Sequence, residues 1–148
     1  MRRAKPPAPV TGSADDVETE FYEALQRGDI ERLMALWSDD EEIACVHPGG
    51  PRLVGAPAIR ASFDAMFANG AIDARPERVR RLDAHSTAVH SVLERIRILT
   101  AEGERFAWVV ATNVYLKSAQ GWRIVAHHAS PGTSAEVQDV VETASTLH

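Results

Sequence analysis

Histidine supplies the clearest candidate chemistry in this sequence, and His47 is the first candidate. It follows a short apolar run, residues 43–46, and opens a turn rich in proline and glycine, HPGGP. An imidazole titrates near neutral pH, which suits it to proton transfer. A histidine in such a loop can instead lie in solvent or bond to a neighbouring carbonyl group. We take His47 as the candidate general base.

Two more histidines, His127 and His128, lie in the last predicted strand. Successive residues of a strand point to opposite faces, so only one of the two can line an interior. His128 shares its parity with Trp122 and Ile124, the larger apolar pair. We therefore expect His128 to face the packed side and His127 to face outward, at a dimer interface. His128 is the second candidate catalytic residue, with a core histidine satisfied by hydrogen bonds as the alternative.

Other aromatic and polar side chains complete the predicted pocket. On the strand before the last, Trp108 has the opposite parity from Asn113 and Tyr115. Either face can line a pocket or a dimer seam, and a β-bulge would exchange the two assignments. Trp37 lies beside the His47 turn, where it can line or cover the cavity. The candidate ligand-binding residues are Trp37, Phe63, Trp108, Asn113, Tyr115 and Ser130.

Neither a cofactor nor a metal ion is expected. A metal site built from His47, His127 and His128 is disfavoured, because adjacent histidines on a strand point apart. Cys45 has no identifiable activating partner, and we expect it to be buried packing. The sequence contains no nucleophile elbow, phosphate loop or dinucleotide fingerprint.

Three helices are predicted ahead of the main strands. Ser13 can cap the first helix, and Gly28 ends it. Asp29 can cap the second helix, residues 30–37, and Pro57 stands near the first position of the third. Because the first two helices are amphipathic and follow one another closely, we expect them to share one apolar surface, that of a sheet.

The remainder of the domain has the pattern of β-structure. We expect strands over residues 43–46, 52–54, 72–84 and 87–99, and a hairpin over residues 106–131. The long strand carries three charged residues that we expect in solvent or in cross-strand ion pairs, with the mouth of the cavity as the alternative: Glu94, Arg95 and Arg97. This order predicts an α+β fold in which a curved antiparallel sheet wraps over the three N-terminal helices as a cone. Such a bent sheet leaves a cavity between itself and the helices.

Length and composition restrict the class of protein. The 148 residues are expected to form one domain over 13–131, with a disordered arm at 1–12 and a tail at 132–148 that includes a short helix. The net charge of −5 argues against a nucleic-acid-binding surface. No apolar run approaches the roughly 20 residues that span a bilayer. With a single cysteine and no apolar leader, we expect a cytoplasmic protein.

Several short motifs, in the same order along the chain, resemble the nuclear transport factor 2-like superfamily, with its SnoaL-like and ketosteroid isomerase-like branch most similar. The motifs are ALQRGDI at 24–30, WSDD at 37–40, HPGG at 47–50, VGAPAI at 54–59, GWRI at 121–124 and HAS at 128–130. The resemblance covers residues 14–131. It implies a cone-shaped, cystatin-like α+β barrel and, commonly, a homodimer formed through the sheet.

The resemblance to ketosteroid isomerases also allows residues to be compared. In those enzymes an Asp-Pro pair after the first short strand carries the general base, and the matching pair here begins with His47. A tyrosine of the first helix helps to bind the oxyanion, and its position here is held by Phe21, with Tyr22 one residue away on a different flank. The acidic partner on the penultimate strand is matched by Val110 or Asn113. Because that oxyanion pair is missing, steroid isomerisation by the same mechanism is not expected.

Two functions remain open at this point. In the first, the protein binds a small, largely apolar molecule and catalyses proton transfer or lyase-type chemistry, with His47 as the base. His128, with Asn113 or Tyr115, would then polarise a carbonyl group. In the second, the protein is a non-catalytic homodimer that binds a ligand or serves as an oligomerisation module. Whether the chain is an enzyme stays undecided from its residues alone.

Overall fold

Two capped helices begin the part of the chain that the structure, a computed structural model, describes: residues 12–133 and 139–141. Helix α1 (Ala14–Arg27) starts at Ser13, whose hydroxyl accepts a hydrogen bond from the Asp16 amide, and ends at Gly28 in the left-handed conformation, with φ of 65°. Helix α2 (Ile30–Ala35) starts at Asp29, which accepts from the Arg32 amide. The predicted caps are therefore present, and α2 is two residues shorter than its pattern suggests.

A short hairpin and a third helix follow. Strands β1 (Ala44–Val46) and β2 (Arg52–Val54) pair antiparallel on either side of the proline- and glycine-rich turn. Gly55 then precedes helix α3 (Ala56–Phe67), which has a proline in its first turn.

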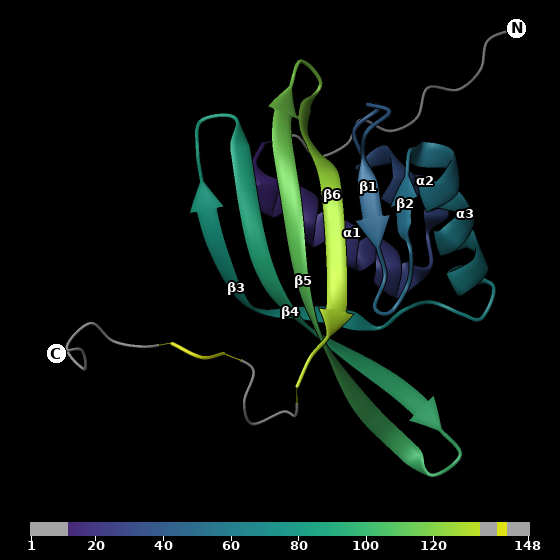
Figure 1. Ribbon diagram of the computed structural model, residues 1–148. Helices are drawn as coiled ribbons and strands as arrows, with labels where there is room; N and C mark the ends of the chain where they lie inside the picture. The colour runs from purple at the N-terminus through teal and green to yellow at the C-terminus, as the bar shows by residue number, and fades with distance from the viewer. Residues whose placement is uncertain (1–11, 134–138, 142–148) are drawn as a thin grey trace, which may run out of the picture.

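Four long strands complete the sheet: β3 (Ala74–Asp83), β4 (Thr87–Thr100), β5 (Gly103–Ser118) and β6 (Gly121–Pro131). The strand order is β2-β1-β6-β5-β4-β3 (Figure 1). Neighbouring strands are antiparallel except β1 and β6, which run parallel. The sheet is curved as predicted, but it is mixed rather than wholly antiparallel, because β1 runs parallel to its neighbour β6.

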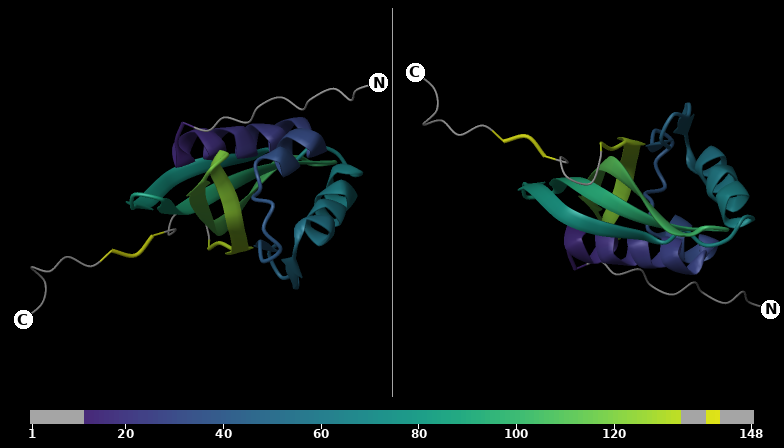
Figure 2. Two further views of the ribbon diagram at one scale, coloured as in Figure 1. Left: turned by 90° about the horizontal axis from the view of Figure 1, so that it is seen from above. Right: turned by 90° about the horizontal axis from the view of Figure 1, so that it is seen from below.

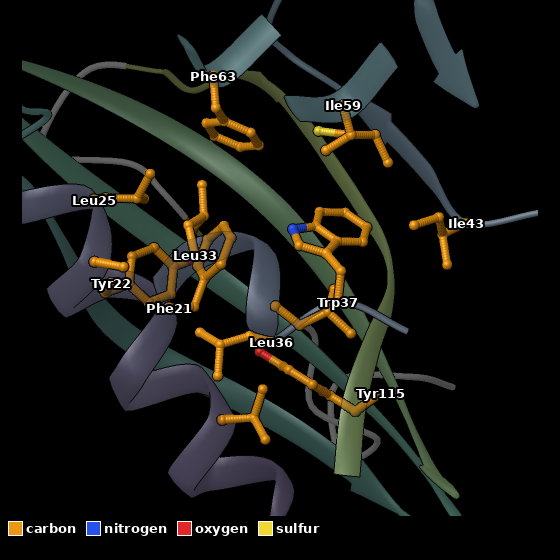
Figure 3. Packing of buried hydrophobic residues seen from close by; sticks show 14 of the residues in the cluster. Phe21, Tyr22, Leu25, Leu33, Leu36, Trp37, Ile43, Ile59, Phe63 and Tyr115 are labelled. Atoms are coloured by element: carbon orange, nitrogen blue, oxygen red, sulfur yellow. The ribbon is translucent and has the colours of Figure 1, made fainter. Parts of the chain in front are cut away.

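The helices enclose one face of this sheet. Helix α1 lies along that face, and α3 stands at the side formed by β1 and β2 (Figure 2). Residues from all three helices and from the sheet form the main core, in which Phe21, Leu33, Trp37 and Phe63 are buried together (Figure 3). We call the helix-covered side of the sheet the inner face and the opposite side the outer face.

One β-bulge in β6 decides which residues reach the inner face. Val114 of β5 lies opposite Ala126, and the next residue, Tyr115, lies opposite Ile124, so that Val125 has no partner. An extra residue of this kind shifts the alternation of side chains by one position. As a result Ile124 and His127, an odd number of residues apart, are both buried.

Parts of the predicted organisation lie outside this description. The arm at 1–12 and the short helix in the tail fall almost entirely on residues that the structure does not describe. Within the described part of the chain, no helix combines the length and apolar character that crossing a membrane requires.

Candidate functional site

Helix α1 presents an acid and a phenol to the inner face, one turn apart. Glu18 and Tyr22 are four residues apart, and Leu25 follows three residues later, so all three share the buried side of the helix. An acid on such a face must find hydrogen-bond partners, because an unpartnered buried carboxylate is strongly destabilising. The sheet supplies those partners in two groups.

The first group is a chain of hydrogen bonds that we call the Glu94 cluster: Tyr22, Glu94, Asn113 and His127. The Tyr22 hydroxyl donates to Oε2 of Glu94 at 2.7 Å and accepts from Nδ2 of Asn113 at 3.2 Å. Oδ1 of Asn113 lies 2.6 Å from Nδ1 of His127. The exposed fractions are 2% for Tyr22, 5% for Glu94, 1% for Asn113 and 6% for His127. Residues from α1, β4, β5 and β6 therefore form one dry polar chain.

The hydrogen bonds of this chain fix the state of His127. The amide nitrogen of Asn113 donates to Tyr22, so its oxygen must accept the proton on Nδ1 of His127. The pKa of His127 is lowered to about 3, mainly by burial and in smaller part by the charges of His47 and His128. The ring is therefore neutral at physiological pH, with Nε2 as a hydrogen-bond acceptor.

Glu94 is the group of this cluster that titrates near neutral pH. The pKa of its carboxyl group is raised from 4.5 to about 7. Burial is the largest cause, the Tyr22 hydrogen bond acts in the opposite direction, and the Glu18 charge raises the pKa. The pKa of Tyr22 is raised well above 10, first by burial and then by the Glu94 charge, so the phenol keeps its proton. At pH 7 Glu94 thus exists in both protonated and ionised forms, next to a phenol that can only donate.

The second group is the Glu18 cluster: Glu18, His90 and Tyr115. Oε2 of Glu18 lies 3.0 Å from Nδ1 of His90 and accepts a hydrogen bond from the Tyr115 hydroxyl at 3.1 Å. The two rings pack against each other with their centroids 4.9 Å apart. Burial, followed by the Glu18 charge, raises the pKa of Tyr115 well above 10, so this phenol also remains a donor.

The two clusters are neighbours in the sheet. His90 of β4 lies opposite Asn113 of β5, which lies opposite His127 of β6. All three side chains are buried on the inner face. They form a polar band across three strands, with α1 lying over it.

His47 stands at the edge of this interior. It follows β1, is half-buried, and meets the Phe63 ring edge-on with centroids 4.9 Å apart. The ring centroid of Phe21 lies 6.4 Å from that of Phe63 and 5.3 Å from that of His127. The rings of Phe63 and Phe21 therefore connect His47 to His127. Burial lowers the pKa of His47. Cys45 is buried as expected, with its Sγ 3.9 Å from Nε2 of His47, and burial raises its thiol pKa to about 12.

The expectation that His128 faces the packed side is wrong. His128 is exposed and His127 is buried, because the bulge at Val125 reverses the alternation that starts from Trp122 and Ile124. His128 and His47 therefore do not face a common interior.

The other predicted ligand-binding residues divide between the two faces. Trp37, Phe63, Asn113 and Tyr115 are buried on the inner side, where Trp37, Phe63 and Tyr115 point toward the same interior (Figure 3). Trp108 and Ser130 have the parity of the outer face: Trp108 is half-buried there and Ser130 is exposed. Trp37 also lines a surface hollow of about 450 Å³ between α2 and α3, together with Met34, Ala56, Pro57 and Arg60.

Sequence reasoning missed most of the buried polar residues. Glu94 was expected in solvent or in an ion pair, and this expectation is wrong. Its position on β4 offered a signal, because Ala88, His90 and Val92 lie on the same face of the strand as Glu94 and are all buried. Tyr22, expected on a different flank of α1 from Phe21, is also buried and supplies the hydroxyl that joins Asn113 to Glu94.

The fold and this arrangement place the protein in a known class. Solved structures described as NTF2-like, with a cystatin-like fold, superpose on the chain; one from Novosphingobium aromaticivorans has a TM-score of 0.68 at 19% identity, over 82% of this chain and 81% of that chain. Residues 15–134 match the family model described as a SnoaL-like domain. The chain belongs to the SnoaL-like domain family.

Two structures with higher identity were also found. A proposed calcium/calmodulin-dependent protein kinase type II association domain from Thiobacillus denitrificans is 33% identical, with a TM-score of 0.76, over 84% of this chain and 99% of that chain. A proposed dehydratase of the NTF2-like family from Streptomyces avermitilis is 31% identical, with a TM-score of 0.72, over 80% of this chain and 93% of that chain. A comparison with curated proteins gave no match.

Proposed function

We propose that this protein binds a small, largely apolar molecule against the inner face of the sheet and transfers a proton with Glu94. The observation that carries the proposal is the buried carboxyl group of Glu94, whose pKa burial raises to about 7. A group with this pKa is well matched to act as a base in one step and as an acid in another at neutral pH.

The neighbours of Glu94 suit the same chemistry. Tyr22 stays protonated and donates to the carboxylate, and its hydroxyl is itself held by Asn113. Neutral His127 offers Nε2 as a fixed acceptor for a hydroxyl group of a substrate. The reaction class is proton abstraction beside a carbonyl group, or loss of water from a hydroxylated carbonyl compound. The similarity to a proposed dehydratase is consistent with the second.

His47 keeps its proposed role as a proton carrier, now at the entrance of the site rather than at its centre. It is half-buried, and the Phe63 ring lies between it and the other aromatic side chains of the interior. In this position His47 can exchange protons with solvent and with a bound molecule. His128, being exposed on the other side of β6, has no part in the proposed site.

Deuterium incorporation tests the proposal without knowledge of the product. The protein is incubated in D₂O with a panel of cyclic and aromatic ketones and β-hydroxy ketones, and exchange next to the carbonyl group is followed by NMR. We expect exchange with the wild type and a loss of about 100-fold or more in Glu94→Gln. The matched control is Glu102→Gln, which makes the same change in an exposed turn. Equal exchange in the two variants, or none with the wild type, would reject catalysis by Glu94.

A second candidate function is assembly through the outer face. Four apolar residues lie opposite one another across β3, β4, β5 and β6: Leu82, Val89, Val114 and Ala126. Leu82 is 75% exposed in the single chain. The other three are half-buried, and a partly exposed apolar row of this kind suits a surface that another molecule covers. The similarity to a proposed kinase association domain is consistent with this reading.

Light scattering tests the assembly. We expect the wild type to be at least a dimer at micromolar concentration and Leu82→Glu to be a monomer. Leu99→Glu is the matched control, because Leu99 is 70% exposed but lies in the far end of β4. A monomeric wild type, or a Leu99→Glu variant that dissociates as readily as Leu82→Glu, would reject assembly through this row.

A further inference from the structure

One buried nitrogen in the Glu18 cluster lacks a hydrogen-bond partner. His90 is fully buried, and its Nδ1 is engaged by Glu18. Its other nitrogen, Nε2, has no hydrogen-bond partner among the described residues. A buried polar atom without a partner is destabilising, so its surroundings indicate what would satisfy it.

Two carboxylates stand over this nitrogen. Nε2 of His90 lies 3.8 Å from Oδ1 of Asp15, in the first turn of α1, and 4.0 Å from Oδ1 of Asp83, at the end of β3. The distances are too long for hydrogen bonds. The side chains of Asp15 and Asp83 are 58% and 65% exposed, so both carboxylates are reachable from solvent. The buried nitrogen therefore forms the floor of a site whose walls are acidic.

Glu18 holds the imidazole in the state that a metal ion requires. A carboxylate can only accept, so Glu18 places the proton on Nδ1 and leaves the lone pair of Nε2 directed toward Asp15 and Asp83. Metal-bound histidines commonly have this arrangement, with the second nitrogen donating to a carboxylate. The Tyr115 hydroxyl donates to the same Glu18 oxygen and so holds the carboxylate in place.

We propose that Nε2 of His90 and the carboxylates of Asp15 and Asp83 bind a divalent transition-metal ion, with Zn²⁺ as the expected occupant. One imidazole nitrogen and two carboxylate oxygens are donors that Zn²⁺ accepts, and water can fill a fourth position. In a tetrahedral Zn²⁺ site neighbouring donor atoms are about 3.4 Å apart. Measured from Nε2 of His90, each carboxylate oxygen lies about half an ångström beyond that spacing.

The local charges favour a cation at this place. Among the residues that the structure describes, Asp15, Glu18 and Asp83 bring three carboxylates, and Arg81 brings a guanidinium group that pairs with Asp15. The amino end of α1 adds a partial positive charge of about half a unit, which is not enough to reverse the balance. Nε of Arg81 donates to Oδ1 of Asp15 at 2.7 Å, so Arg81 competes with the metal ion for that oxygen.

Zinc titration of the tag-free protein tests the proposal, with isothermal calorimetry and competition against a chromogenic zinc chelator as two readouts. We expect saturable one-to-one binding by the wild type and an affinity at least about tenfold lower in Asp15→Asn and in Asp83→Asn. Both changes are at exposed carboxylates, so the fold is expected to persist. Asp16→Asn, in the same turn of α1, is the matched control and should bind as the wild type does.

A second pair of variants tests the competition by Arg81. Arg81→Gln should bind Zn²⁺ several-fold more tightly, whereas Arg80→Gln, the adjacent and exposed position on β3, should not. Co²⁺ bound in place of Zn²⁺ should give visible absorption bands that Asp83→Asn weakens. Absence of zinc binding by the wild type would overturn the proposal. Binding that is unchanged in Asp15→Asn and Asp83→Asn would also overturn it, because the metal would then be held elsewhere.

Discussion

The two polar clusters beneath α1 contain the same groups in exchanged places. In the Glu94 cluster the acid stands on the sheet and the phenol on the helix; in the Glu18 cluster the acid stands on the helix and the phenol, Tyr115, on the sheet. Each acid–phenol pair continues to a histidine. Glu18 contacts His90 directly, whereas Asn113 separates Tyr22 from His127.

The difference between the clusters lies in how many donors each acid has. Oε2 of Glu18 faces both Nδ1 of His90 and the hydroxyl of Tyr115, whereas the contact of Glu94 is with one donor, Tyr22. A carboxylate with one donor in a dry setting is poorly compensated, and its pKa rises to about 7. Burial with a single donor among the described residues is therefore the setting in which the pKa of Glu94 is raised.

Removal of the Glu18 carboxylate should have the largest effect on stability. Glu18→Ala leaves the nitrogen of His90 and the hydroxyl of Tyr115 without an acceptor, and both are buried. We expect the free energy of unfolding to fall by about 3 kcal/mol or more, measured by urea denaturation at pH 7. Glu23→Ala, on the same helix, serves as the control. A loss no greater than that of the control would show that the cluster does not hold α1 to the sheet.

The pH dependence of stability should report the raised pKa of Glu94. The folded-state pKa of Glu94 is about 7, and the ordinary value is 4.5, so the folded state binds more protons than the unfolded state between these pH values. Stability therefore falls as pH rises through this window, by about 3 kcal/mol from this group. Glu94→Gln should remove that fall. The measurement is denaturation of both proteins from pH 4.5 to 8, and parallel curves would contradict the raised pKa.

Substitution of the two adjacent histidines of β6 should change the free energy of unfolding by very different amounts. His127→Ala removes a buried ring and leaves Oδ1 of Asn113 without its donor, so we expect a loss of about 2 kcal/mol. His128→Ala acts on an exposed side chain and should cost less than about 0.5 kcal/mol. Thermal or urea unfolding of the two variants is a direct check on the bulge. The reverse order would place His128 inside, as the plain alternation of the strand suggests.

Loss of a phenol hydroxyl is expected to destabilise the protein less than loss of the His127 ring. Tyr22→Phe should cost about 1 kcal/mol and should also raise the pKa of Glu94, because the Tyr22 hydrogen bond lowers that pKa. Tyr115→Phe removes the same atom from the other cluster and should leave Glu94 nearly unchanged. Carbon-13 NMR of the glutamate carboxyl groups over a pH series separates the two cases. An equal shift in both variants would mean that the clusters act as one electrostatic unit.

The fold was largely accessible from the sequence because its signals are local. A few neighbouring residues determine each of these signals. They are the helix caps at Ser13 and Asp29, the end of α1 at Gly28, and the hairpin turns. The parallel pairing of β1 with β6 was not predicted, since it joins segments some 80 residues apart, and no local pattern specifies it.

The candidate site was less accessible, for two physical reasons. The bulge at Val125 has no residue signature such as a glycine, so the inward direction of His127 was assigned to His128. The partners of the two buried acids lie far away in sequence, Tyr22 at 72 residues from Glu94 and Tyr115 at 97 from Glu18, so no local pattern marks these acids as buried. His47 is half-buried, and Phe63, Asn113 and Tyr115 are buried on the inner side; for Asn113 and Tyr115 the sequence had left the face open.

The central place of β6 in the sheet has a consequence for how the chain is made. Among the described strands β6 is the last to be synthesised, yet β1 and β5 both pair with it. Until Gly121–Pro131 has been synthesised, β1 and β2 lack their place beside the long strands, and β5 exposes a bare edge. Nascent chains stalled before this point are therefore the form of the protein most exposed to misassociation and most dependent on chaperones.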